Sequence, residues 1–155
     1  SARHDVLHKF YADNFKESYN TGLSDDVVYI GELAGYLHCL DAKTGKRFWV
    51  YDLKSSCWGS AYHVAGKIFI SNEDGEVLVF RHEKNPLILD EVVQALQADN
   101  KRAAKKICHE VRNKIRDNYL YLKNEFDAPI RSTPVVANGV LYVMTEQHLY
   151  AFGSD

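Results

Sequence analysis

The first nineteen residues place apolar side chains at the spacing of an α-helix. Leu7, Tyr11 and Phe15 recur every four positions and so form one apolar stripe. This pattern predicts a helix over residues 4–19, and the run Asn20-Thr21-Gly22 is a typical helix stop. Beyond this point the apolar positions alternate with period two, which is typical of β-strands.

The alternating pattern returns three times along the chain. Each copy contains three short runs rich in β-branched and aromatic residues, separated by turn residues such as Asp74-Gly75 and Asn138-Gly139. These dipeptides favour hairpins because both residues tolerate positive φ. The predicted strands cover residues 27–30, 36–40 and 47–51 in the first copy, 61–64, 67–70 and 77–80 in the second, and 133–136, 140–143 and 148–152 in the third.

The spacing of the copies is that of a propeller blade. Gly35 and Gly75 open the same strand in the first two copies, 40 residues apart. Short antiparallel strands repeated at this period predict β-propeller blades. The repeat is interrupted at residues 89–123, where Ile107, Val111 and Ile115 return to helical spacing. We therefore expect a fold that is α+β by content: an incomplete antiparallel β-propeller with an N-terminal helix and a helical insertion.

Length and composition fit one globular domain over residues 1–155. The first and second blades are expected at residues 24–84 and the third at residues 125–152. The chain is 46% hydrophobic and 26% charged, which is ordinary for a soluble globular protein. It contains no run of about 18 apolar residues that would predict a transmembrane helix. The N-terminus lacks the apolar stretch of a signal peptide, so the chain is cytosolic or begins after a signal that was removed.

The most specific motif runs from Asp41 to Trp49 and reads Asp-Ala-Lys-Thr-Gly-Lys-Arg-Phe-Trp. It resembles the docking motif of PQQ-repeat propellers, the family of quinoprotein dehydrogenases and their non-catalytic relatives. The resemblance extends over roughly residues 24–84 and 125–152. It implies that Asp41 and Thr44 bond the backbone of a turn while Gly45 takes positive φ. It also implies that Trp49 lies between neighbouring blades as a large buried contact.

Catalytic members of that family need more than this chain offers. They hold the quinone on a tryptophan platform in a complete ring, with a calcium-binding cluster, a catalytic Asp and often two bridged adjacent cysteines. Here the blades number only about two and a half, no cysteines are adjacent, and Asp41 is used in the turn. We therefore expect no catalytic, cofactor-binding or metal-binding residues and no cofactor. Cys39, Cys57 and Cys108 are interpreted as buried free thiols, with a single disulfide as the alternative.

Two arrangements that include histidine are candidates for chemistry. His4 and His8 lie four apart on the predicted helix, a spacing that can place two imidazoles on one metal, but no third ligand stands nearby. Cys108 and His109 are adjacent on a helix and so point in different directions, which argues against a nucleophile pair. The remaining strand histidines are interpreted as ordinary sheet residues. They are His38, His63, His82 and His148.

Positive charge gathers in the predicted insertion. Residues 101–123 carry eight Lys or Arg against Glu110 and Asp117, within a chain of net charge −2. This pattern favours a solvated helix face, or alternatively a docking helix for an acidic protein partner or a polyanion. Nucleic acid is not expected, because basic and aromatic residues do not interleave. The candidate partner-binding residues are Lys101, Arg102, Lys105, Lys106, Arg112, Lys114 and Arg116.

An incomplete ring leaves apolar blade flanks that a soluble protein must cover. We expect the two predicted helices to cover these flanks and the chain to associate with itself. The alternative is a larger protein that supplies further blades.

The function predicted is a non-catalytic protein-interaction or scaffold module. It would be similar in kind to the propeller scaffold lipoproteins of outer-membrane assembly, with a partner strand added at an open sheet edge. The first alternative is a fragment of a quinoprotein dehydrogenase, and the second is an engineered or rearranged propeller. The resemblance implies the periplasm as compartment.

Overall fold

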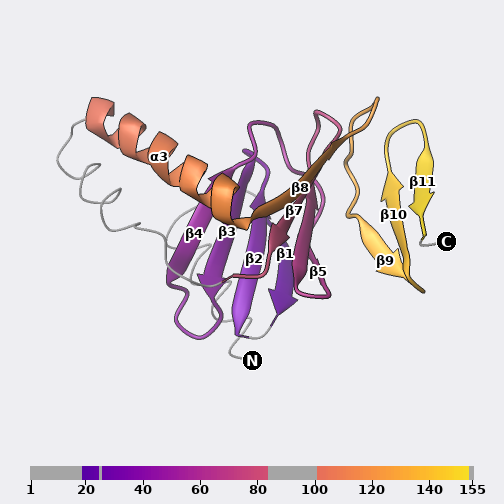
Figure 1. Cartoon of the computed structure of the whole chain (residues 1–155), viewed down its shortest axis with the longest axis horizontal. Coiled ribbons are helices and arrows are strands. Elements are labelled where there is room, and N and C mark those ends of the chain that lie inside the picture. Colours follow the sequence, from indigo (N-terminus) through magenta and orange to yellow (C-terminus); the bar gives the residue numbers. More distant parts are fainter. Residues whose placement is uncertain (1–18, 25, 84–100, 154–155) are drawn as a thin grey trace.

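The computed structural model describes residues 19–24, 26–83 and 101–153, which form three antiparallel sheets and one long helix (Figure 1). The first sheet, the first blade, has the strand order β1-β2-β3-β4. It consists of β1 (Tyr19–Ser24), β2 (Val27–Glu32), β3 (Tyr36–Asp41) and β4 (Arg47–Asp52).

The second blade is interrupted in sequence but has four neighbouring strands in the order β5-β6-β7-β8. Its strands are β5 (Tyr62–Val64), β6 (Lys67–Ser71), β7 (Glu76–Arg81) and β8 (Leu120–Glu125). The insertion lies between β7 and β8, which pair from Glu76↔Glu125 to Phe80↔Leu120 with a register shift at Val79/Phe80. The chain therefore leaves the sheet after β7 and returns to complete the blade.

The third blade has the order β11-β10-β9 and lies at the opposite end of the molecule from the start of α3 (Figure 1). Its strands are β9 (Val135–Ala137), β10 (Val140–Met144) and β11 (Leu149–Phe152). All nine strands expected from the alternating pattern are present, with ends that differ by at most two residues. The prediction of antiparallel blades in an incomplete propeller is confirmed.

The helical insertion ends earlier than the sequence predicted. Helix α3 spans Lys101–Tyr119, and residues 120–123, expected to be helical, belong to β8. Leu122 follows Tyr119 by three positions, so the apolar stripe continues into the strand and hides the boundary. Pairing with β7 satisfies backbone groups that would otherwise stay open at this sheet edge. The residues expected in the first part of the insertion, 89–100, lie outside the described residues.

The first strand of the first blade was not predicted. Residues 4–18 of the expected N-terminal helix lie outside the described residues, but Tyr19 begins β1 rather than ending a helix. The segment Asn20-Thr21-Gly22, expected as a helix stop, pairs with β2 over its whole length. Its polar residues and glycine carry little strand propensity, so only the presence of β2 beside it makes it a strand.

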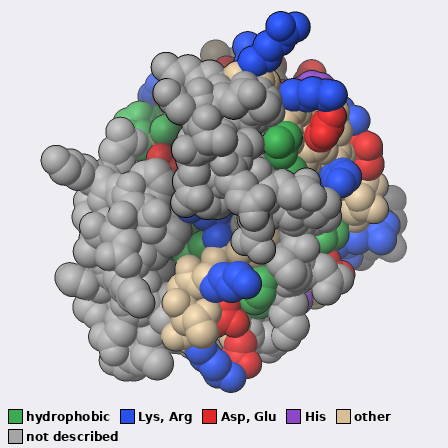
Figure 2. All heavy atoms as spheres, turned by 90° about the vertical axis from the view of Figure 1, so that its left-hand side faces the viewer, with side chains coloured by type: hydrophobic (Ala, Val, Ile, Leu, Met, Phe, Trp, Pro, Cys, Tyr) green, Lys and Arg blue, Asp and Glu red, His purple; other side chains and the backbone are tan. Residues whose placement is uncertain are grey.

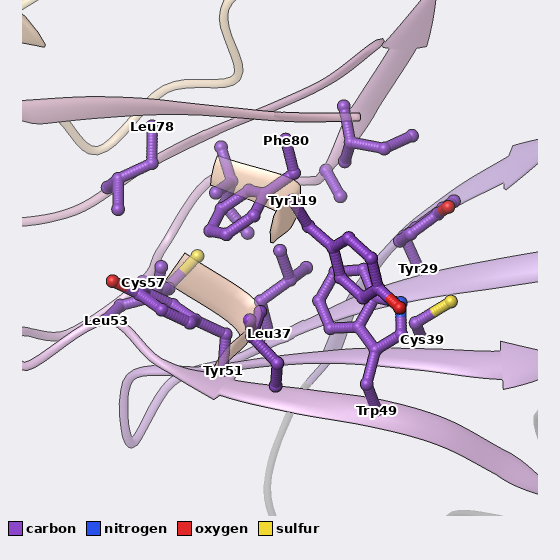
Figure 3. Packing of buried hydrophobic residues seen from close by; sticks show 14 of the residues in the cluster. Tyr29, Leu37, Cys39, Trp49, Tyr51, Leu53, Cys57, Leu78, Phe80 and Tyr119 are labelled. Carbon is purple, nitrogen blue, oxygen red and sulfur yellow. The ribbon is translucent and has the colours of Figure 1, made fainter. Parts of the chain in front are cut away.

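Two hydrophobic layers hold the blades together. The larger layer lies between the first and second blades and includes Leu37, Trp49, Ile70 and Phe80, with Tyr119 from the end of α3 packed onto it (Figure 3). The smaller layer lies between the second and third blades. Its members are Val77, Val79, Ile130 and Val143, with Phe69, Phe126, Leu141 and Tyr150 at its margin.

Candidate interaction surface

The turn between β3 and β4 is organised by one carboxylate oxygen of Asp41. It accepts hydrogen bonds from the backbone N–H groups of Lys43 and Thr44, at 2.9 and 2.7 Å, and from the Thr44 hydroxyl at 2.9 Å. Gly45 takes a φ of +72°, a conformation that costs glycine little. The hydrogen bond from the Thr44 amide is the main reason that the pKa of Asp41 lies below its ordinary value.

Trp49 lies fully buried between the first two blades (Figure 3). Its ring centroid is 5.9 Å from that of Tyr29 on β2, and 5.8 Å from those of Phe80 on β7 and Tyr119 on α3. The rings are tilted with respect to one another rather than stacked, which aromatic pairs favour. One side chain therefore contacts both blades and the inserted helix.

The polar atoms near Trp49 are used internally. The main-chain carbonyl oxygen of Glu83 accepts hydrogen bonds from the indole nitrogen of Trp49 at 2.8 Å and from the thiol of Cys39 at 3.7 Å. The Tyr29 hydroxyl lies 2.8 Å from Nδ1 of His82. Burial raises the pKa values of Tyr29 and Cys39 well above their ordinary values. Both groups therefore stay protonated at neutral pH, and the thiol is no activated nucleophile.

The second described cysteine is equally inert. Cys57 is buried, its thiol donates to the Gly59 carbonyl oxygen at 3.3 Å, and burial raises its pKa to about 12. Cys39 and Cys57 are thus buried free thiols, as the sequence predicted. The side chain of Cys108 lies outside the described residues, whereas its neighbour His109 is exposed on α3.

His38 forms a buried pair with Glu32, at 2.9 Å between Nε2 and Oε2. Burial lowers the pKa of His38 although the hydrogen bond to Glu32 opposes the effect, so the imidazole is neutral near pH 7. Across residues 19–24, 26–83 and 101–153, no three His, Cys, Asp or Glu side chains are placed to hold a metal ion. The candidate metal pair His4 and His8 lies outside the described residues.

Helix α3 presents most of its described basic side chains outward. Arg102, Lys105, Lys106 and Lys114 are exposed, and Lys106 lies 3.9 Å from Glu110. Arg116 is exposed as well and pairs with Asp117 at 2.9 Å. The side chain of Lys101 lies outside the described residues. Figure 2 views the molecule from the side on which α3 begins and shows Lys and Arg side chains scattered over the described part of that face.

Arg112 differs from the other basic residues of α3. Its guanidinium carbon lies 5.1 Å from the ring centroid of Tyr51, and its Nε donates to the Asp52 carbonyl oxygen at 3.3 Å. Arg112 is half-buried by these contacts with β4. It therefore fastens the helix to the first blade and contributes little to the outward face.

The basic helix leads directly into an exposed strand. Helix α3 ends at Tyr119 and β8 begins at Leu120 at the end of the second sheet, so its outer edge is open within the described residues (Figure 1). Tyr121 and Leu122 are 56% and 44% exposed. The Nζ atom of Lys67 lies 5.6 Å from the Tyr121 ring centroid, and the guanidinium carbon of Arg81 lies 5.8 Å from it. The strand thus presents an apolar patch beside cationic groups.

Sequence reasoning missed this edge because residues 120–123 continue the helical stripe. One signal could have found it: the second copy of the repeat lacks an outer strand, and the run Leu120-Tyr121-Leu122 is a β-prone segment close before the third copy. We find no helix in the described part of the chain with the length and hydrophobicity to cross a bilayer.

Three comparisons with known proteins bear on this architecture. A family model described as "Outer membrane protein assembly factor BamB" matches residues 8–101. The outer membrane protein assembly factor BamB of Shewanella oneidensis is 37% identical over 62 residues, which are 37% of this chain and 16% of that protein. The chain therefore spans only a small part of the curated relative that it matches.

Among solved structures, the computationally designed protein Ika8 superposes with a TM-score of 0.55 over 86% of this chain and 32% of its own, at 8% identity. This likeness concerns the fold alone. The quinohemoprotein alcohol dehydrogenase ADHIIG of Pseudomonas putida HK5 is 32% identical over 42% of this chain and 11% of its own, with a TM-score of 0.38.

Antiparallel blades that pack through aliphatic and aromatic layers, and whose sheets do not close into a ring within the described residues, define an incomplete β-propeller. The family match covers more than half of the residues. The chain belongs to the PQQ-repeat propeller family that includes the BamB assembly factors, as its docking motif indicated.

Proposed function

We infer that the protein is a non-catalytic interaction module that binds an extended, acidic segment of a protein partner. The observation that carries this proposal is the continuity between the exposed basic face of α3 and the open edge of β8. In this mode the partner adds a strand to β8 through main-chain hydrogen bonds, while the helix attracts its negative charge.

The geometry of β8 supports strand addition. An edge strand offers unpaired N–H and C=O groups, and Tyr121 and Leu122 offer apolar contacts for alternate side chains of an added strand. Lys123 bonds to Glu76 and, at 3.2 Å, to Glu125, so this part of the edge is electrically compensated. The free cationic attraction therefore comes mainly from the helix.

The exposed cations of α3 are proposed to attract the acidic segment. They are Arg102, Lys105, Lys106, Lys114 and Arg116, together with Lys101. Arg112 is left with a structural role because its guanidinium rests on Tyr51. Surface charges of this kind raise association rates more than they lower dissociation rates, and salt screens them over about 8 Å at physiological ionic strength.

The motif residues Asp41, Thr44, Gly45 and Trp49 are proposed to have a blade-docking role. The turn closed by Asp41 and Thr44 ends at β4, whose Trp49 packs on Phe80 of the second blade. The proposed compartment is the periplasm, by analogy with the assembly factors of the family. Membership of an assembly complex and association of the chain with itself belong to the same proposal.

A peptide-binding measurement tests this function. The probe is a synthetic ten-residue peptide that alternates Val or Thr with Asp or Glu, titrated against the full chain at two salt concentrations. We expect binding that weakens several-fold between about 20 and 150 mM salt, together with slower amide exchange in β8. The same peptide with N-methyl groups along one edge should not bind, because it cannot complete the ladder.

Two Lys→Glu variants test whether the helix, rather than the rest of the surface, attracts the peptide. Lys105→Glu should lower the association rate several-fold, whereas Lys46→Glu, exposed in the turn before β4, should leave it unchanged. Equal binding of the N-methylated peptide, or equal effects of the two substitutions, would contradict the proposal. Dye reduction upon addition of quinone, calcium and further blades would support the dehydrogenase-fragment alternative instead.

A further inference from the structure

Two cations face each other across neighbouring strands of the second blade. Lys67 on β6 pairs directly with Arg81 on β7, so the two side chains lie on the same face of the sheet. Like charges placed directly opposite one another destabilise a sheet. Neither cation forms an ion pair with another residue in the described part of the chain. The arrangement therefore costs stability unless an anion from outside compensates it.

The ring of Tyr121 on β8 lies beside both cations. Its centroid is 5.6 Å from Nζ of Lys67 and 5.8 Å from the guanidinium carbon of Arg81. Strand β7 lies between β6 and β8, whose backbones are therefore about 10 Å apart. The side chains of Lys67 and Tyr121 must lean towards one another across β7 to come this close. The three side chains thus form one cluster on one face of the sheet, next to the open edge of β8.

The position of Tyr121 comes from an irregularity of the edge strand. Leu120 pairs with Phe80, and Leu122 pairs with Val79. Tyr121 is therefore the extra residue of a β-bulge, which leaves it out of the ladder and changes the direction of its side chain. Bulges occur preferentially at sheet edges and beside functional sites. The bulge holds the Tyr121 ring beside the two cations while 56% of the residue remains exposed.

The chemistry of this cluster matches a carboxylate. The exposed Arg81 guanidinium can donate two parallel hydrogen bonds, and the Lys67 ammonium adds a second positive charge. The Tyr121 hydroxyl is a further donor. A carboxylate placed here would also offset the repulsion between the two cations, which a neutral or basic side chain would leave in place. The cluster therefore favours one negative charge at the edge of the sheet.

We propose that Lys67, Arg81 and Tyr121 bind the carboxylate of a single Asp or Glu in the strand that is added at β8. This binding mode rests on the strand addition proposed above, and it names the side chain that is recognised there. The cations of α3 attract the whole partner over a distance, whereas this cluster makes contact at one position of the ladder. The partner needs an acidic residue at that position and tolerates neutral residues elsewhere on the same face.

Three further ten-residue peptides test this binding mode. One has Gln at every acidic position of the alternating peptide, the second keeps one central Glu, and the third has another Glu two residues further on. Calorimetry at about 150 mM salt, where remote charges are screened, gives the affinity for the full chain. We expect the single-Glu peptide to bind ~10-fold more tightly than the Gln peptide. The second Glu should add less than about twofold, since it lies outside the cluster.

Matched Arg→Gln variants locate the effect. Arg81→Gln should bring the affinities for the Glu and Gln peptides to within about twofold of each other. Arg102→Gln, at an exposed position of α3, should keep the preference for Glu. The thermal midpoint of Arg81→Gln should stay within about 2 °C of the parent or rise, because the substitution removes a like-charge pair. The loss of preference therefore cannot come from unfolding.

Equal binding of the Glu and Gln peptides by the parent would overturn the proposal, as would a preference that Arg81→Gln does not reduce. Either result leaves strand addition intact as long as the peptides slow amide exchange in β8. If the alternating peptide fails to slow that exchange, strand addition at β8 is wrong, and recognition of a carboxylate there is wrong with it.

Discussion

The indole nitrogen of Trp49 donates a 2.8 Å hydrogen bond to the main-chain carbonyl oxygen of Glu83. Trp49 stands on β4 of the first blade, and Glu83 follows β7 of the second, so the bond joins two blades across their shared core. Because the indole is fully buried, its loss removes the stronger of two donors to this carbonyl oxygen, which also accepts from the Cys39 thiol at 3.7 Å.

Substitution of Trp49 should therefore be costly. Trp49→Ala should lower the free energy of unfolding by about 3–5 kcal/mol, since it leaves a large cavity between the blades. Trp49→Phe should cost about 1–3 kcal/mol, through the lost hydrogen bond and the smaller ring. Urea denaturation followed by circular dichroism measures both. Tyr142→Phe, at a side chain that is 37% exposed, serves as control and should stay within about 0.5 kcal/mol of the parent.

The Asp41 turn should give a pH-dependent contribution. Its pKa is lowered in the folded state, so its carboxylate stabilises the fold above the unfolded pKa, and this is lost as the pH falls through the folded value. Asp41→Ala should cost roughly 1 kcal/mol at pH 7, and the difference from the parent should shrink in acid below pH ~4. Urea midpoints from pH 7 to pH 3 measure it. A difference that stays constant with pH would argue against the carboxylate as the source.

His38 should give a pH dependence in a different range. Its folded pKa is lowered, so between that value and the unfolded value near 6.5 the unfolded chain binds more protons, and stability rises with pH. His38→Gln should remove this slope, because glutamine can still donate to Glu32 but does not titrate. His148→Gln, at an exposed position, should retain the slope. The test is to measure the free energy of unfolding between pH 4.5 and 7.5, a range around the pKa of histidine in the unfolded chain.

Two glycines should respond to alanine for different reasons. A Cβ on Gly59 would lie 2.5 Å from the Ser132 carbonyl oxygen, so Gly59→Ala should displace the backbone that enters the third blade and cost about 1–3 kcal/mol or more. Gly66 has open space around it but a φ of +70°, so Gly66→Ala should cost about 1 kcal/mol through backbone strain. Hydrogen exchange distinguishes them: only Gly59→Ala should speed exchange in β9 to β11.

Much of the fold could be predicted from local patterns. The nine predicted strands follow from period-two alternation and from turns such as Asn138-Gly139, because strand pairing within a hairpin needs only neighbouring residues. The basic character of α3 could also be predicted, because Lys and Arg are concentrated in this part of the sequence. The strands β1 and β8 were not predictable in this way, since each owes its conformation to a partner strand, and Leu122 prolongs a helical stripe into β8.

The sequence alone determined the blades, the docking motif and the family, because these are properties of short segments and their spacing. Only the tertiary structure decided that the basic helix ends at an open strand edge, that Arg112 is turned inward onto Tyr51, and that Leu149 is exposed where Leu37 is buried. Leu37, Val77 and Leu149 occupy the same position of the repeat. Whether such a side chain is core or surface depends on what lies against it, and that is set by contacts between blades rather than by the residue or its neighbours in sequence.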